Sequence, residues 1–361
     1  MLIYWLNFFS VSVYRFIIKN KGVLVFLITL QLFLILALRD NSVGVDLGAY
    51  EGMYNYIGRL GWQNLLSRLH FFSIAELPEN MRIESGYAVF NWLIYQLGFS
   101  YHAFLVVCAA VTLLPVGWFI YKYSKNPSLS FLIYISTELY INNFGILRQS
   151  IAIGILVLSV PFILQKRLKM SLLFLALAFT FHRVSLLWLP LCFAPYITLN
   201  KQKFATLIAG GFVFWAGFFA LGHGFAVSIL SFLGKTRYIG DSLRYSNTIV
   251  LIILIIGLIY LLCDITKLAK DSLYNLLFWA LIETFYFNII TSYMLLNRAL
   301  PVLLIFVAVL VPNMLCQVRY QLSPYQKKLL HFSIVGVLTL VLFMYMIYRL
   351  KDSYIIPYRF Y

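Results

Sequence analysis

The sequence predicts an all-α membrane protein, a bundle of eleven or twelve transmembrane helices joined by loops. Apolar residues fill 62% of the 361 positions and charged residues 11%, whereas soluble domains average roughly 45–50% and about 25%. A soluble chain of this size needs polar groups facing water, so this composition favours helices that face lipid. The 26 Tyr and 32 Phe are typical of many helix ends at a membrane interface.

Apolar runs bounded by charges and turn residues mark the expected spans, because a helix crosses a bilayer with roughly 17–25 apolar residues. The expected spans are 2–18, 22–38, 101–121, 128–146, 148–165, 170–182, 184–198, 204–222, 248–264, 273–290, 299–316 and 330–348. The first run has no basic start and no small-residue cleavage site, so we interpret it as a helix and not as a cleavable signal. The pair 170–182 and 184–198 is short for two crossings, so we expect a tilted, broken or re-entrant helix there. The whole chain, 1–361, is expected to form one integral membrane domain.

The basic residues predict which loops lie outside. With the short loop 19–21 placed inside, the loops on its side carry mostly Lys and the loops on the other side mostly Arg. The long polar segment 39–100, with expected short helices at 49–70 and 86–97, and the loop 223–246 then face outward. The planar fork of Arg suits recognition of phosphate or carboxylate. The alternative is that these arginines pair with outer-loop acids or with lipid headgroups.

Several classes of function find no support in the sequence. The four Cys have no spacing typical of disulfide frameworks or zinc sites, and no His, Asp or Glu cluster has metal-ligand spacing. We therefore expect no metal and no cofactor. The net charge of +16 is not gathered into a basic block, so we expect no nucleic-acid partner. Neither of the common nucleotide-binding fingerprints is present.

Polar residues at helix breaks are the candidate site. Arg148 begins a helix after the break near Asn143, and helix N-termini favour anions. His182 and Arg183 interrupt a long apolar run, where a His beside an Arg suits a general base next to an anion site. Two acids within expected spans, Glu138 and Glu283, are functional candidates or halves of buried structural pairs.

Five short elements, in order along the chain, resemble the Wzy/EpsG-type polysaccharide polymerases. They are LRDNSVGVDLGAY at 38–50, ESGYAVFN at 84–91, RQSIA at 148–152, FHRVS at 181–185 and NR at 297–298. Each element alone is a weak signal, but together they run through most of the chain.

The resemblance implies a multi-pass protein of the bacterial inner membrane with a fold similar to the C-type glycosyltransferases. It implies joining of oligosaccharide repeat units, carried on undecaprenyl pyrophosphate, at the outer face. The implied partners are these lipid-linked units, membrane lipid and a chain-length regulator protein. The chain has no room for a sugar-nucleotide domain, in keeping with a lipid-linked donor.

In such a reaction the leaving group is a pyrophosphate, which positive charge stabilises. The candidates for binding it are Arg39, Arg148, Arg183 and Arg298. The acceptor hydroxyl needs a general base, and the candidates are His182, Glu84 and Asp46. Inversion and retention at the anomeric carbon both stay open.

Two other functions also stay open. One is another enzyme of similar shape: a ligase that moves finished glycan onto lipid A, which would use a similar set of arginines because its donor is the same, or an acyltransferase of surface glycans. A transporter or flippase of the lipid-linked unit would show an internal repeat, and we find none.

Overall fold

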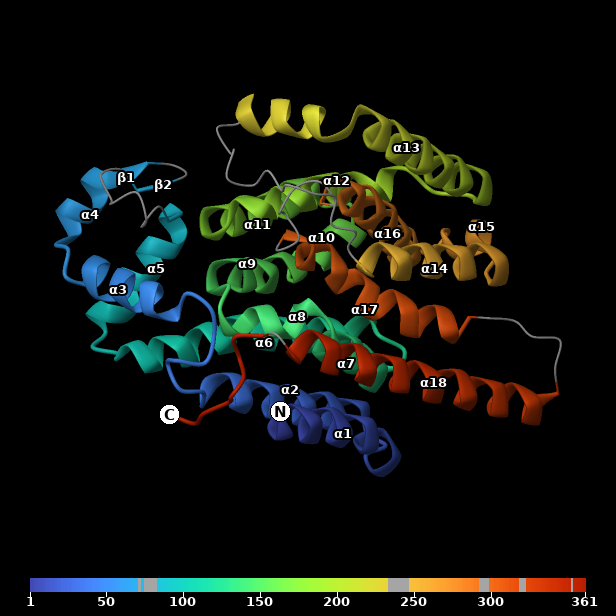
Figure 1. Cartoon of the computed structure of the whole chain (residues 1–361), viewed down its shortest axis with the longest axis horizontal. Helices are drawn as coiled ribbons and strands as arrows, with labels where there is room; N and C mark the ends of the chain where they lie inside the picture. The colour runs from blue at the N-terminus through green and yellow to red at the C-terminus, as the bar shows by residue number, and fades with distance from the viewer. Residues whose placement is uncertain (71–72, 75–82, 233–246, 292–298, 318–322, 352) are drawn as a thin grey trace. The chain divides into compact units, whose positions relative to one another are not determined.

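The computed structural model describes residues 1–70, 73–74, 83–232, 247–291, 299–317, 323–351 and 353–361, and these are mainly helical (Figure 1). The prediction of an all-α protein is thereby confirmed. The chain divides into two compact units, one made of Met1–Leu189 with Ser323–Tyr361 and the other of Pro190–Leu322.

The first unit holds both ends of the chain. Its elements are α1 (Leu2–Ile17), α2 (Lys21–Ala37), α3 (Leu47–Gly58), α4 (Trp62–Arg68), β1 (Leu69–His70), β2 (Ser73–Ile74), α5 (Ser85–Gln96), α6 (Tyr101–Tyr123), α7 (Pro127–Ser136), α8 (Glu138–Ile141), η2 (Asn142–Phe144), α9 (Leu147–Val157), α10 (Val160–Leu164), α11 (Leu168–Phe181), η3 (Arg183–Trp188) and α18 (Pro324–Lys351). The two strands form a two-residue antiparallel pair.

The second unit starts within α12 (Leu189–Phe193), whose first residue is the last of the preceding segment of the first unit. Its other elements are η4 (Ala194–Tyr196), α13 (Lys201–Phe232), α14 (Asn247–Leu262), α15 (Ile265–Leu268), α16 (Ser272–Thr291) and α17 (Pro301–Leu315). Because α13 continues to Phe232, the first part of the expected loop 223–246 is helical. The rest of that loop lies outside the described residues.

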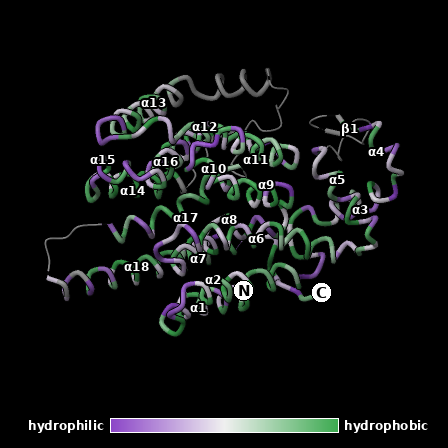
Figure 2. Tube along the Cα trace, turned by 180° about the vertical axis from the view of Figure 1, so that it is seen from behind, coloured by the Kyte–Doolittle hydropathy of each residue, from purple (hydrophilic) through white to green (hydrophobic). Residues whose placement is uncertain are grey.

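Four helical segments among the described residues are long and apolar enough to cross a membrane: Tyr101–Tyr123, Leu147–Leu164, Ser272–Ile290 and Lys328–Lys351. Six shorter apolar helices accompany them. Figure 2 shows the helices coloured mainly as hydrophobic, with hydrophilic residues at turns such as the one between α1 and α2. These helices support a membrane protein, while the count of eleven or twelve spans stays a prediction.

Two expected spans are wrong as single helices. Span 128–146 is divided, because Thr137 is extended after α7 and the chain restarts as α8 and η2. The Asn143 side chain there donates to the Tyr134 hydroxyl at 2.7 Å. Such side-chain bonding offers the chain an alternative to a regular helix. Span 184–198 is a series of short pieces, η3, α12 and η4, in the region where a broken helix was expected.

Segment 39–100 contains the short helices that its sequence predicts, with one difference. The helix expected over 49–70 is two helices, α3 and α4, separated near Gly61, which is extended as the N-cap of α4. The helix expected over 86–97 is α5. Within the first unit α3 packs against α5, and α5 packs against α11, so this polar segment is ordered against the apolar helices.

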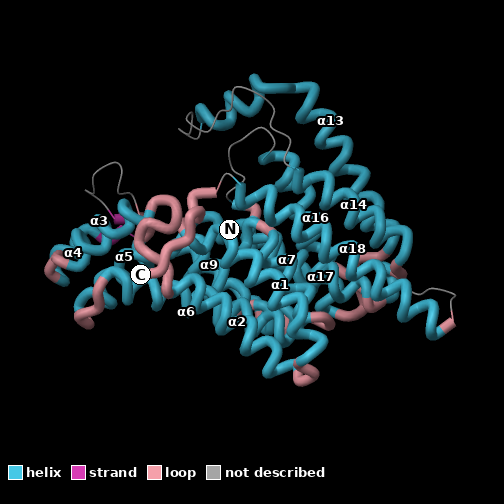
Figure 3. The backbone as a smooth tube through the Cα atoms, turned by 60° about the horizontal axis from the view of Figure 1, so that its bottom comes forward, coloured by secondary structure: helices cyan, strands magenta, loops and turns pink. Residues whose placement is uncertain are grey.

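The C-terminal residues pair with the chain that follows α2. The backbone N–H of Tyr361 donates to the Leu38 carbonyl at 3.0 Å, and that of Asp40 donates to the Arg359 carbonyl at 2.8 Å. The ring of Tyr361 stacks on His102, with centroids 3.6 Å apart. Figure 3 marks the C-terminus of the chain among loop segments of the first unit. We call residues 353–361 the C-terminal clasp. Since it touches the start of segment 39–100, both must lie on the same side of a membrane.

Candidate active site

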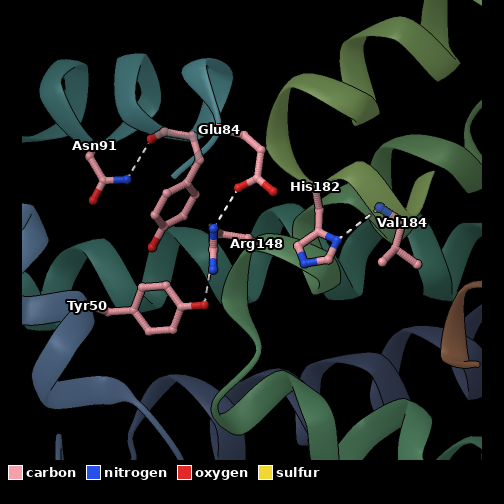
Figure 4. A network of polar contacts seen from close by, with 7 residues as sticks. Tyr50, Glu84, Asn91, Arg148, His182 and Val184 are labelled. Carbon is pink, nitrogen blue, oxygen red and sulfur yellow. Dashed lines mark hydrogen bonds and ion pairs between the residues drawn. The ribbon is translucent and has the colours of Figure 1, made fainter. Parts of the chain in front are cut away.

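Four segments of the first unit bring polar side chains together: α3, the start of α5, the start of α9 and the turn between α11 and η3 (Figure 4). The centre is an ion pair in which Arg148 Nη1 lies 2.6 Å from Glu84 Oε2. The Glu84 side chain is 9% exposed and that of Arg148 22%. An ion pair shielded from water to this degree interacts more strongly than one on an open surface.

Aromatic hydroxyl groups complete one side of this cluster. The Nε of Arg148 donates to the Tyr50 hydroxyl at 3.4 Å, and the Tyr50 ring packs edge-on against Tyr87 with centroids 5.8 Å apart. Tyr87 is fully buried, and among the described residues its hydroxyl has no hydrogen-bond partner. An unsatisfied buried hydroxyl costs free energy, so its presence beside the ion pair marks the position as one where a polar ligand group would be stabilised.

Close packing of α5 on α11 brings Glu84 near His182. A Cβ on Gly86 would overlap the side chain of Thr180, which lies two residues before His182. The rings of Phe90 and Phe181 extend this contact, with centroids 5.9 Å apart. Only glycine allows the two helices to approach so closely at this point.

A second close approach sets the start of α9. A Cβ on Gly145 would come within 2.6 Å of the Val45 carbonyl oxygen, and one on Gly44 would overlap the Phe144 carbonyl. Gly44 also has a φ of +142°, which residues with a side chain rarely adopt. The loop before α3 therefore packs on the break before α9, and this contact holds Tyr50 and Arg148 at a fixed separation.

A Gly86→Ala substitution tests the first of these contacts. We expect the added methyl group to push α5 away from α11 and to lower stability by roughly 1–3 kcal/mol, with a larger fractional loss of activity because Glu84 moves relative to His182. Thermal unfolding in detergent and glycan assembly in cells measure the two effects. Gly52→Ala in α3 is the matched control, because nothing lies within 4 Å of its Cβ position. Equal behaviour of the two variants would contradict this role of Gly86.

The structure brings together three of the sequence-predicted site residues, Glu84, Arg148 and His182. Asp46 lies one helical turn before Tyr50, at the N-cap of α3 with a left-handed φ of 64°, and its side chain is exposed. Arg183 is next to His182 and is also exposed. Arg298 lies outside the described residues.

The Arg39 side chain is buried in the interior of the first unit. The residue is 1% exposed, and its backbone forms a bridge with Phe360 of the C-terminal clasp. Its Nη1 donates to the Leu36 carbonyl at 2.5 Å, and its guanidinium lies over the Phe144 ring at 5.3 Å from the centroid. Burial lowers the pKa of Arg39 to about 10. These contacts make Arg39 part of the packing under the clasp, so a role in binding pyrophosphate would require the clasp to open.

The sequence alone does not predict Tyr50 and Tyr87 as site residues, because tyrosines of a membrane protein are mainly interface anchors. A signal was present, because both lie within elements that resemble the polymerase family, at 38–50 and 84–91. Among the described residues no three His, Cys, Asp or Glu side chains gather into a group able to hold a metal ion.

A comparison of the sequence with protein families supplies the family of the chain. A family model described as the EpsG family matches residues 22–360. The chain belongs to the EpsG family. This is the family of Wzy/EpsG-type polysaccharide polymerases, so the resemblance carried by the five short elements is confirmed. No curated protein and no solved structure matches this EpsG-family chain.

Membership of the EpsG family gives the cluster its chemical context. It supports a polymerase-type role in polysaccharide assembly and, with the apolar helices, a membrane protein. A carboxylate, an arginine and tyrosine hydroxyl groups can together accept a proton and bind an anion. Those are the two tasks that glycosyl transfer from a phosphate-linked donor requires.

Proposed function

We propose that this EpsG-family protein is a bacterial polysaccharide polymerase of the inner membrane. It joins oligosaccharide repeat units carried on undecaprenyl pyrophosphate, at the outer face and without a metal ion. The observation that carries the proposal is the Glu84–Arg148 pair, with Arg148 Nη1 and Glu84 Oε2 2.6 Å apart, in a chain whose family assembles polysaccharides.

Arg148 is the proposed binding residue for the leaving pyrophosphate. A guanidinium forms charge-assisted hydrogen bonds with phosphate oxygens, and positive charge at this point stabilises the negative charge that develops as the glycosidic bond to phosphate breaks. A pyrophosphate carries more negative charge than the single Glu84 carboxylate. When the pyrophosphate binds, Arg148 therefore moves from Glu84 to the pyrophosphate. A carboxylate oxygen of Glu84 is then free to bind the acceptor hydroxyl.

Glu84 is the proposed general base. Its carboxylate takes the proton from the acceptor hydroxyl, the hydroxyl oxygen bonds to the anomeric carbon, and the electron pair of the breaking bond leaves with undecaprenyl pyrophosphate. Direct attack of this kind inverts the anomeric centre. The tyrosines beside the pair, Tyr50 and Tyr87, present a hydroxyl and an aromatic edge to the sugar.

The test uses a strain that makes the matching surface glycan and from which this gene has been deleted. If the protein is the polymerase, the deletion leaves glycan of a single repeat unit, and the wild-type gene restores a ladder of lengths on a gel. Purified protein in lipid nanodiscs should also elongate lipid-linked units extracted from the deletion strain, and EDTA should leave the ladder unchanged.

Two other results would replace the proposal. A deletion strain that accumulates long glycan on undecaprenyl pyrophosphate would identify a ligase. A strain that retains single units on the inner face of the membrane would identify a flippase. In either case the purified protein would fail to lengthen lipid-linked units.

A further inference from the structure

The turn between α11 and η3 fixes the chemical form of His182. This residue is extended, with φ −159° and ψ 128°, and serves as the N-cap of η3. Its Nδ1 accepts a hydrogen bond from the backbone N–H of Val184 at 3.2 Å. Figure 4 shows this bond on the side of the imidazole that faces η3.

A backbone N–H can only donate, so the Nδ1 atom that receives it presents a lone pair and carries no proton. A neutral imidazole has one N–H, and with Nδ1 as acceptor that N–H is on Nε2. The local backbone therefore assigns the tautomer. In this tautomer Nε2 is a hydrogen-bond donor and has no lone pair with which to take a proton from an acceptor hydroxyl.

The Nε2 side of the ring faces the ion pair. In Figure 4 the second nitrogen of His182 lies on the side of the ring toward Arg148, and Glu84, Arg148 and Arg183 act electrostatically on the imidazole. The packing of α11 against α5 and α9 keeps the ring in this place. A neutral donor can stand beside Arg148 without adding a second positive charge.

We propose that His182 binds the substrate as a hydrogen-bond donor, through Nε2–H to an oxygen of the leaving pyrophosphate, and is not the general base. This inference rests on the proposed function, since it concerns the same site. Each of three residues then has one role. Glu84 accepts the proton of the acceptor hydroxyl, Arg148 supplies the positive charge, and His182 supplies an uncharged hydrogen-bond donor with a fixed direction.

Two amide substitutions separate the two nitrogens of His182. In His182→Gln the side-chain amide reaches the region of Nε2 and restores a donor there, while the contact with Val184 is lost. In His182→Asn the shorter amide places its oxygen near the Nδ1 position, where it accepts the Val184 N–H in the manner of an ordinary N-cap, while the donor at Nε2 is lost. His182→Ala removes both.

The readout is the ladder restored in the deletion strain, together with the elongation rate of purified protein. We expect His182→Gln to keep activity within about tenfold of wild type, and His182→Asn and His182→Ala to lose roughly 100-fold, as for loss of one donor to a developing oxyanion. Thermal unfolding in detergent should show His182→Asn near wild type.

Two patterns overturn the inference. If His182→Asn is active and His182→Gln is as poor as His182→Ala, the residue acts only as a cap. If His182→Gln and His182→Asn are both as poor as His182→Ala, a donor at the Nε2 position does not suffice and His182 is the base. The charged groups that act on the ring are Glu84, Arg148 and Arg183. Tyr87 and Tyr95 on α5 and Lys169 on α11 are the other titratable groups of these packed elements, and any pH dependence of the rate that persists in His182→Gln belongs to these groups.

The wild-type control separates this inference from the proposed function. If wild type lengthens lipid-linked units and His182→Gln does not, the donor role fails and the polymerase stands. If wild type lengthens nothing, the proposed function itself fails.

Discussion

Arg148→Ala is expected to abolish the glycan ladder, with a fall in elongation rate of at least about 100-fold. The substitution removes the charge that stabilises the leaving pyrophosphate and leaves Glu84, whose side chain is 9% exposed, without its ion-pair partner. Arg148→Lys is expected to recover little, because an ammonium lacks the planar fork that meets phosphate oxygens. Elongation by purified protein, with expression checked in membranes, measures the effect.

A charge swap separates binding of substrate from support of the fold. The double variant Glu84→Arg with Arg148→Glu keeps an ion pair at this place, so we expect it to recover part of the thermal stability lost in Arg148→Ala. It should not recover elongation, because the arginine then lies on α5 and the carboxylate on α9. Arg59→Ala is the matched control, an exposed arginine of segment 39–100 that should leave the ladder intact. A swapped variant that elongates normally would reduce the pair to a structural role.

Glu84→Gln is expected to lower elongation by roughly 10²–10⁴-fold, the contribution typical of a general base. The amide has nearly the shape of the carboxylate and still offers an oxygen to Arg148, so the fold should persist. It cannot take a proton from the acceptor hydroxyl. Binding of a lipid-linked unit, measured with the purified variant, should change far less than elongation.

The control for this substitution is Glu51→Gln, which changes another acid of segment 39–100, on the helix α3 that also carries Tyr50. It should behave as wild type. A Glu84→Gln variant with more than a tenth of normal elongation would move the base to another residue, with exposed Asp46 next in line.

The sequence was sufficient to predict the class of fold, and it named three residues that the structure brings together, Glu84, Arg148 and His182. Apolar runs mark most of the observed helices because burial of apolar surface and the length needed to cross lipid act on the same residues. Arg148 and His182 stand out in the sequence because charged and polar side chains at helix breaks in an apolar chain are costly without a task. Glu84, in the polar segment 39–100, is predicted only through the resemblance to the polysaccharide polymerases.

Other features depend on tertiary contacts that local patterns do not contain. The break at Thr137 interrupts a run that is apolar on both sides, so hydropathy alone gave one helix where the structure has three short pieces. The burial of Arg39 follows from pairing with Phe360, at the far end of the sequence. The nearness of Glu84 to His182 depends on Gly86, a residue whose absent side chain leaves no signal in composition.

The C-terminal clasp has a consequence for biosynthesis. Tyr358 donates to the Ile35 carbonyl across 323 residues, and Tyr4 donates to Ile355 across 351. The ribosome therefore makes and inserts α1, α2 and Arg39 long before the residues that cover them exist. Until the clasp is made, Leu38, Arg39 and Asp40 lack the backbone partners that Tyr361, Phe360 and Arg359 supply. The first unit is therefore completed only after all the helices that the structure describes have been synthesised.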